Sequence, residues 1–163
     1  MLDYIFHHLR NNGKFSKRVK KRYDIFWHDP QAEQVRNAPM SRYDSIEKWE
    51  NAPYWQRRLS NKYNAREFAA MHGCRVSELY WKGADVENID FSILPPYYVI
   101  RPTVGHSSDN VFVMDHGQNL FDRKYYSGEE IVAILKNEIA KKPYLEFLVE
   151  EFLENEEGNH AIL

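Results

Sequence analysis

The sequence predicts an α+β fold in which helices come first and strands and helices are mixed afterwards. Three observations lead to this prediction. Helix-capping residues precede helix-like segments, at Asp44 and Ser45, at Ser60 or Asn61, and at Ser127. Two short β-rich runs, 97–101 and 110–114, flank a single loop. The first sixty residues contain helix-like patterns, whereas the remaining hundred contain both kinds of pattern.

The predicted helices have recognisable starts or stops. Ser60 or Asn61 is the expected N-cap of a helix that Gly73 ends, because glycine readily adopts a left-handed conformation after the last turn. Ser127 and Glu130 fit a capping box. An earlier helix is expected to stop at "HDP", residues 28–30. The expected helices cover residues 2–10, 16–27, 45–51, 62–72 and 128–142.

The predicted strands include a hairpin with a long connection. Two residues would be enough to join the runs 97–101 and 110–114, and long hairpin loops are commonly functional or flexible. The loop is interpreted as a lid over phosphates, and the alternative is a mobile surface loop that binds nothing. The other expected strands or extended segments cover 74–81, 119–126 and 145–153.

The composition argues against several classes of function. The chain has 163 residues and a formal net charge of -2, which argues against general affinity for nucleic acid. It has no apolar run near the roughly 18 residues of a membrane span, and a cytoplasmic location is expected. The single cysteine, Cys74, excludes an internal disulfide and a multi-cysteine zinc site, and we expect it to fill a small space in the core. Because His7 and His8 would point about 100° apart on a helix, no metal site is expected there.

Charge is unevenly distributed along the chain. Residues 10–22 contain seven Lys or Arg and no acid, whereas residues 146–157 contain six Glu and no base. The basic run, 14–22 in particular, could contact anionic lipid at the inner membrane face. The simpler interpretation is a solvated helix face.

Four segments could bind an anionic ligand. Lys62 opens a helix, where a cation and free backbone N–H groups can face an anion. Arg101 ends an apolar strand. The loop 103–110 contains Gly105, which permits close backbone approach, and hydroxyl donors. Glu150 lies near the end of a buried strand, where a carboxylate can accept from an amine.

The chain resembles the nucleotide-binding half of the ATP-grasp superfamily through a series of motifs. In order along the chain, these are "NKYNAREF", "ELYW", "YYVIRP", "TVGHSSDNVFVM" and "LVEEFLE". Over about residues 58–160 they are most similar to its TupA-like branch, associated with bacterial cell-surface polysaccharide or teichuronopeptide synthesis. The resemblance divides the chain into an N-terminal helical segment, 1–57, and an ATP-grasp-like portion, 58–163, with an antiparallel sheet and helices.

The resemblance also implies a role for each matching residue. Lys62 would contact ATP phosphates, and Arg101 would take the place of the lysine that bridges the α- and β-phosphates. Glu150 would accept a hydrogen bond from the adenine amino group. The other implied contacts are a phosphate lid at Gly105, His106, Ser107 and Ser108, the adenine edge at the backbone of Glu151 and Leu153, and the ribose hydroxyls at Glu157.

The sequence departs from the family pattern in three ways. Asn61 stands where the family has an acid, Arg101 where it has lysine, and the loop is poor in glycine. The family's Mg²⁺ ligands lie on strands after the adenine segment, so the chain is expected to be truncated and to act as a ligase only if it continues past Leu163. The resemblance implies an enzyme that activates a carboxylate as an acyl phosphate for attack by an amine. The alternative is a non-catalytic interaction module that docks on a membrane-associated assembly.

Overall fold

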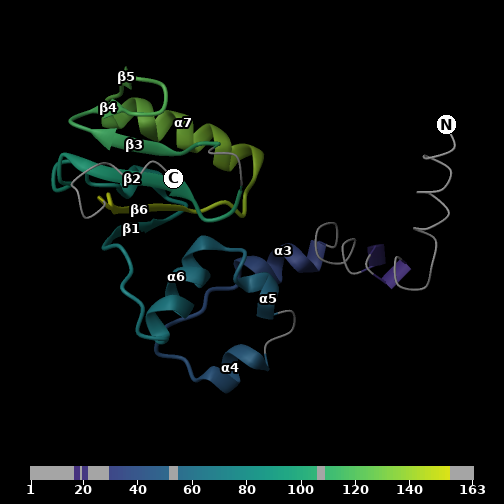
Figure 1. Cartoon of the computed structure of the whole chain (residues 1–163). Helices are drawn as coiled ribbons and strands as arrows, with labels where there is room; N and C mark the ends of the chain where they lie inside the picture. The colour runs from purple at the N-terminus through teal and green to yellow at the C-terminus, as the bar shows by residue number, and fades with distance from the viewer. Residues whose placement is uncertain (1–16, 19, 22–29, 52–54, 106–108, 155–163) are drawn as a thin grey trace, which may run out of the picture.

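The computed structural model describes residues 17–18, 20–21, 30–51, 55–105 and 109–154. These residues form helices and a six-stranded antiparallel sheet, which confirms the α+β class (Figure 1). The strands are β1 (Leu79–Gly83), β2 (Tyr97–Pro102), β3 (Phe112–Asp115), β4 (Gln118–Asn119), β5 (Lys124–Tyr125) and β6 (Phe147–Glu151). The helices are α3 (Pro30–Asn37), α4 (Ile46–Glu50), α5 (Trp55–Arg58), α6 (Lys62–Met71) and α7 (Gly128–Lys141), with a 3-10 turn η1 (Val86–Asn88).

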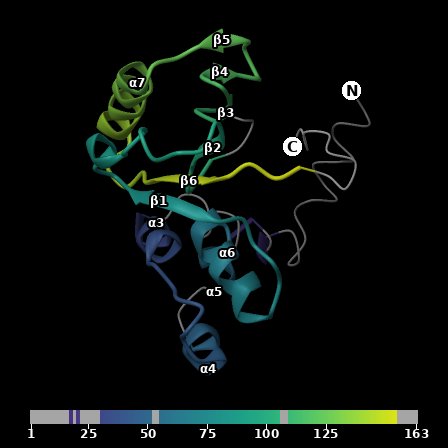
Figure 2. The same ribbon diagram turned by 90° about the vertical axis from the view of Figure 1, so that its left-hand side faces the viewer.

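The sheet order is β1-β6-β2-β3-β4-β5, so β6, the last of the described strands in sequence, lies between β1 and β2. Helix α7 lies against one face of the sheet, and the helices α3 to α6 lie beyond β1 (Figures 1 and 2). The N-terminus of α6 reaches the end of β2, because the Lys62 backbone N–H donates to the Thr103 carbonyl at 2.7 Å.

The main core lies between α7 and the sheet. Successive strand residues point to opposite faces, and in β2 the buried residues alternate with half-buried ones. The face toward α7 is apolar, whereas the other face carries Arg101 and Glu150. The buried residues of this core, from the sheet and from α7, include Ile100, Phe112, Met114, Ile131, Leu135, Phe147 and Val149.

The predicted helix starts are confirmed where the structure describes them. The Ser45 side chain accepts from the Lys48 backbone at the start of α4. Asn61, not Ser60, caps α6, and both halves of the capping box of Ser127 and Glu130 are present at α7. Gly73 follows α6 with a φ of 78°, as expected of a residue that ends a helix.

Two helices were not predicted. Proline was expected to stop a helix at residue 30, but α3 begins there, because a first-turn residue needs no backbone N–H and proline already has a helical φ. Helix α5 is a single turn, too short for a periodic pattern. Residues 17, 18, 20 and 21 are helical, as expected for 16–27, while the rest of that prediction and all of 2–10 lie outside the described residues.

The strand predictions need correction at their ends. The first strand begins at Leu79 rather than at residue 74, and the expected core residue Cys74 is exposed. Segment 119–126 is not one extended run. It contains the end of β4, a turn in which Arg123 has a φ of 60°, and β5. The predicted hairpin of β2 and β3 is confirmed, with Tyr97 opposite Asp115.

The N-terminal helices are tied to α6 by buried polar contacts. The Asn64 side chain accepts from the Met40 backbone at 3.0 Å, and the Arg42 guanidinium donates to Glu67 at 2.7 Å. In addition, Trp49 packs on Phe68 with ring centroids 5.4 Å apart. Residues of the predicted segment 1–57 therefore pack directly on a helix assigned to the portion 58–163.

These contacts predict a pH-dependent contribution from Glu67. Burial raises the pKa of its carboxyl, but the hydrogen bonds and charge of Arg42 outweigh this and hold the pKa below 4.5. Since the pKa is lower in the folded state, the stabilisation is present above the unfolded pKa and is lost as pH falls through the folded pKa. Glu67→Gln is therefore expected to lower the free energy of unfolding by about 2 kcal/mol at neutral pH and by less at acid pH.

Urea unfolding of parent and variant at neutral and acid pH measures this difference. The exposed ion pair of Glu87 with Lys136 supplies the control, because Glu87→Gln is expected to leave the unfolding free energy unchanged. A difference between Glu67→Gln and the parent that is the same at both pH values would contradict the assignment.

Candidate functional site

Three of the four segments singled out in the sequence meet at the N-terminus of α6. The Lys62 backbone N–H binds the Thr103 carbonyl, and the Lys62 Nζ donates to the Gly105 carbonyl at 3.1 Å. Both acceptors follow β2 directly. The start of α6 is thereby fastened to the beginning of the predicted phosphate lid.

Asn61 fixes where α6 begins. It is 3 % exposed, and its side-chain oxygen accepts from the backbone N–H groups of Tyr63 and Asn64. Its amide nitrogen donates to the Asn37 side chain at 3.2 Å. An aspartate could cap the helix equally well but could not make this second contact, so asparagine at this position suits the packing against α3.

Arg101 and Glu150 bring β2 and β6 into the same site. Val99 is opposite Glu150 and Arg101 is opposite Leu148, so the two charged side chains are diagonal neighbours on the face away from α7. The Arg101 Nη2 lies 2.8 Å from Glu150 Oε2. The pair is unequally covered, because the Arg101 side chain is 28 % exposed and that of Glu150 is 4 % exposed.

Several buried polar atoms of this site have no hydrogen-bond partner among the described residues. They are Glu150 Oε1, Arg101 Nε and the hydroxyl of Thr103, a residue with 0 % exposure. An unpaired buried polar group lowers the stability of the fold by about 1–3 kcal/mol. A cluster of such atoms therefore indicates a place where a ligand could supply the missing hydrogen bonds. Here an acceptor and two groups able to donate come from neighbouring positions.

The site is also electrostatically biased toward an anion. Burial lowers the pKa of the Lys62 ammonium, and the charges of Arg101 and Arg36 lower it further, while Glu150 opposes the shift. These surroundings therefore disfavour the charged form of the Lys62 amine. A bound anion would relieve this positive charge.

Gly105, the first residue of the predicted phosphate lid, has a backbone conformation that favours glycine. Its φ is 130°, which side-chain-bearing residues rarely adopt. A Cβ at this position would come no closer than 3.7 Å to Pro102, so the constraint is the backbone angle and not space. The carbonyl that Lys62 holds belongs to this residue.

The structure therefore brings together four of the predicted site residues: Lys62, Arg101, Gly105 and Glu150. Glu151 ends β6, with its backbone N–H bound to the Glu78 carbonyl and its carboxylate accepting from the Glu78 backbone. Leu153 lies beyond the strand and is 51 % exposed. The remaining predicted residues, His106, Ser107, Ser108 and Glu157, lie outside the described residues.

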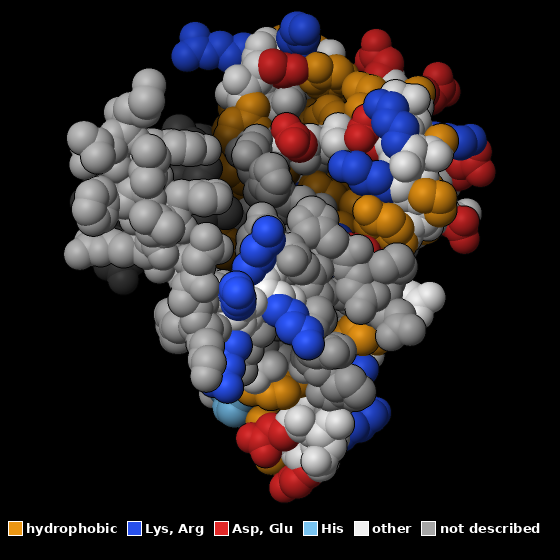
Figure 3. Space-filling view, turned by 90° about the vertical axis from the view of Figure 1, so that its right-hand side faces the viewer, with side chains coloured by type: hydrophobic (Ala, Val, Ile, Leu, Met, Phe, Trp, Pro, Cys, Tyr) orange, Lys and Arg blue, Asp and Glu red, His pale blue; other side chains and the backbone are white. Residues whose placement is uncertain are grey.

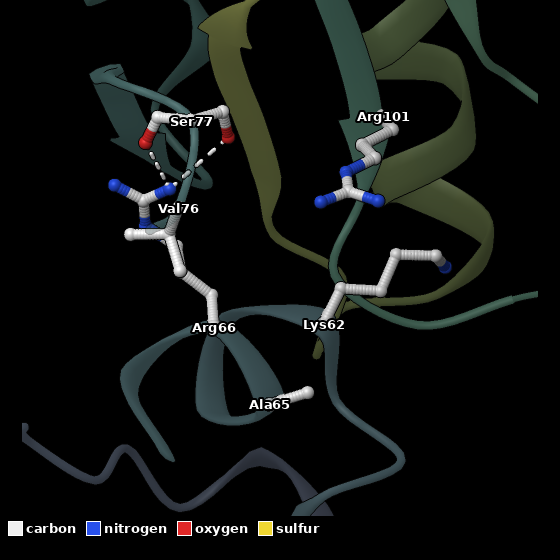
Figure 4. Close-up of a pocket in the computed structure, with 6 residues that line it drawn as sticks. All are labelled: Lys62, Ala65, Arg66, Val76, Ser77 and Arg101. Atoms are coloured by element: carbon white, nitrogen blue, oxygen red, sulfur yellow. Dashed lines mark hydrogen bonds between the residues drawn. The ribbon is translucent and has the colours of Figure 1, made fainter. Parts of the chain in front are cut away.

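Two residues of the site were missed in the sequence. Thr103 lies within the loop that was considered, but an ordinary threonine gave no reason to expect its burial. Arg66 follows Lys62 by four residues, and this spacing puts both side chains on one face of a helix. The spacing could therefore have indicated Arg66 as a site residue. Both cations line an open pocket of about 280 Å³ with Ala65, Val76, Ser77 and Arg101 (Figure 4).

The basic run is represented by four described residues, Lys17, Arg18, Lys20 and Lys21, all exposed. Figure 3 shows Lys and Arg side chains gathered in the middle of one face of the molecule.

None of the helices that the structure describes is long and apolar enough to cross a membrane. Within the same residues, no group of three or more His, Cys, Asp or Glu is placed to hold a metal ion.

Comparison with protein-family models, with curated proteins and with solved structures finds no match to this chain.

Proposed function

We propose that this chain is the nucleotide-binding portion of an ATP-grasp-type carboxylate–amine ligase. The observation that carries the proposal is the convergence of Lys62, Arg101, Gly105 and Glu150 from distant parts of the chain, in an order that resembles that superfamily. The expected phosphate-binding cations and the expected adenine acceptor lie within one site. The unpaired buried atoms support a ligand there.

Each residue has chemistry suited to part of ATP. The ammonium of Lys62 and the fork of Arg101 can both bind phosphate oxygens, and arginine can do so through two parallel hydrogen bonds. Glu150 already uses Oε2 to hold Arg101, so Oε1 is the atom left to accept from the exocyclic amine of adenine. The backbone at Gly105 can approach the phosphates closely.

The complete reaction would need more than these residues. In such a ligase a carboxylate oxygen attacks the γ-phosphorus, ADP leaves, and an amine then displaces phosphate from the acyl carbon. Mg²⁺ would offset the charge of the triphosphate, with ligands from a part of the enzyme other than this site. A role in bacterial cell-surface polysaccharide synthesis and contact of residues 14–22 with an anionic membrane both stay predictions.

Lys62→Met tests the phosphate contact. The variant is expected to bind ATP and ADP about tenfold more weakly, the loss of one charge-assisted hydrogen bond, and to bind adenosine as the parent does. Because the surroundings disfavour the charge of Lys62, its melting temperature is expected not to fall, so weak binding will not reflect unfolding.

Isothermal titration of the parent, Lys62→Met and Lys48→Met measures these affinities. Lys48 is a suitable control because its side chain is 67 % exposed and forms a local ion pair, with Asp44 at 2.6 Å. If the parent fails to bind ATP, or if Lys62→Met binds it equally well, the proposed function is wrong.

A further inference from the structure

Lys62 has surroundings that phosphate binding alone does not require. The residue is half-buried, and its Nζ donates a hydrogen bond to the Gly105 carbonyl at 3.1 Å. Among the described residues the Lys62 amine forms no ion pair, since the nearby carboxylate of Glu150 is paired with Arg101. The amine is thus held in place by a neutral acceptor and has no counter-ion of its own.

The neighbours of Lys62 favour its uncharged form. Burial lowers the pKa of the amine most, and the charges of Arg101 on β2 and Arg36 on α3 lower it further, whereas Glu150 on β6 raises it. A lysine that is partly removed from water beside other cations loses its proton more readily. The neutral amine is a nucleophile that attacks carbonyl carbons.

Arg101 can bind a phosphate group next to this nucleophile. Lys62 and Arg101 line the same open pocket, and Figure 4 shows the Lys62 side chain on the Arg101 side of it, extending away from Arg66. The Arg101 side chain is 28 % exposed, and its Nη2 lies 2.8 Å from the Glu150 carboxylate. A guanidinium has more N–H donors than one carboxylate oxygen can use, so Arg101 can hold Glu150 and an anionic ligand together.

We propose that Lys62 reversibly forms an imine with a small aldehyde that carries a phosphate group, and that Arg101 binds this phosphate. The neutral amine attacks the carbonyl carbon, and a C=N bond replaces the C=O bond. The carbonyl oxygen leaves as water with the two hydrogens of the amine, and no oxidant or reductant is consumed. A protonated imine keeps one N–H, which can stay bonded to the Gly105 carbonyl.

The imine would occupy the amine that the proposed function assigns to the phosphates of ATP. A phosphorylated aldehyde would therefore compete with ATP and inhibit its binding. This regulatory consequence rests on the proposed function, whereas formation of the imine does not.

Labelling of the full chain with glyceraldehyde 3-phosphate tests the proposal. Sodium cyanoborohydride reduces each imine to a stable secondary amine, and mass spectrometry of peptides locates the labelled lysines. Lys124, which is exposed on the edge strand β5, is the control. We expect Lys62 to be labelled about tenfold faster than Lys124, the gain from one charge-assisted hydrogen bond to the phosphate. Inorganic phosphate is expected to slow labelling of Lys62 and not of Lys124.

Glyceraldehyde, which lacks the phosphate group, separates the role of Arg101 from the reactivity of the amine. With this probe the preference for Lys62 over Lys124 is expected to fall about tenfold. The double variant Arg101→Met with Glu150→Leu leaves no buried charge without a partner. In this variant the two aldehydes are expected to give the same preference, and a ratio of rates within one sample is insensitive to the amount of folded protein that the variant yields.

Each outcome decides between the proposals. Equal labelling of Lys62 and Lys124 by glyceraldehyde 3-phosphate, or equal preference with both aldehydes in the parent, would show that no such site exists. A double variant that keeps the difference between the aldehydes would exclude Arg101 as the phosphate ligand. If Lys62 is labelled as expected but ATP does not slow the labelling, the imine site stands and the proposed function fails. If ATP binds the parent and Lys62 shows no preference, the imine proposal fails and the proposed function stands.

Discussion

Arg101→Met is expected to lower the free energy of unfolding by about 3 kcal/mol, and adding Glu150→Leu is expected to restore most of that loss. The single change leaves a carboxylate that is 4 % exposed without its cation. A buried charge that has lost its partner is strongly destabilising, whereas replacing both members of a buried pair with apolar residues is often neutral.

The double variant separates stability from function. Leucine and methionine roughly preserve the volume of the pair on a face where Leu148 is already fully buried. The protein should therefore be folded but should lack both the phosphate contact and the adenine acceptor. ATP binding is expected to fall by about a hundredfold or more, since two charged hydrogen-bonding groups are removed.

A double-mutant cycle tests this prediction. Chemical denaturation and ATP titration are measured for the parent, for Arg101→Met, for Glu150→Leu and for the double variant. The exposed pair of Lys136 and Glu87 gives a control in which neither single nor double replacement should matter. A double variant as unstable as Arg101→Met would show that the ion pair does not explain the stability. A stable double variant that binds ATP like the parent would remove Arg101 and Glu150 from the site.

Trp49→Ala is expected to have an effect of similar size in a different part of the molecule. Trp49 is fully buried and packs on Phe68 of α6. Replacing a large buried aromatic residue with alanine costs about 3–5 kcal/mol. Because α6 also carries Lys62, loss of this contact is expected to weaken ATP binding as well.

Thermal unfolding of Trp49→Ala also tests whether the helical segment and the sheet are separate units. The contacts of α6 with residues on both sides predict one transition at a lower temperature than in the parent. Tyr43→Ala is the control, because Tyr43 is 91 % exposed in the same segment. Two resolved transitions would instead support a domain boundary near residue 57, and an unchanged melting temperature would contradict the packing argument.

The parts of the fold that could be predicted from sequence depend on neighbouring residues. Asn61, Ser127 and Glu130 cap helices through contacts with backbone groups within three residues, so their effect is visible in the sequence. The hairpin of β2 and β3 was recognised for a related reason, since two short β-rich runs flank a single loop in the sequence. The position of β6 between β1 and β2 depends on pairings between distant residues. Trp81, for example, pairs with Val149, 68 residues further along the chain.

The candidate site was predicted in part for a different reason. Lys62, Arg101, Gly105 and Glu150 were chosen from the order of motifs, and the structure brings them together. The ion pair of Arg101 with Glu150 could not be foreseen, because it depends on the register of β2 against β6. The spacing of Arg66 from Lys62 could have placed it on the same face of α6, but its contact with Ser77 depends on tertiary packing and could not be foreseen.

The central position of β6 has a consequence for how the protein is made. A ribosome synthesises β1 and β2 long before β6, and until residues 147–151 emerge neither strand has the neighbour that joins them. Both would expose unpaired backbone groups during that interval, and exposed strand edges favour association between chains. Assembly of this sheet must therefore wait for residues 147–151, so we expect the nascent chain to be most prone to aggregation after β2 has emerged and before β6 leaves the ribosome.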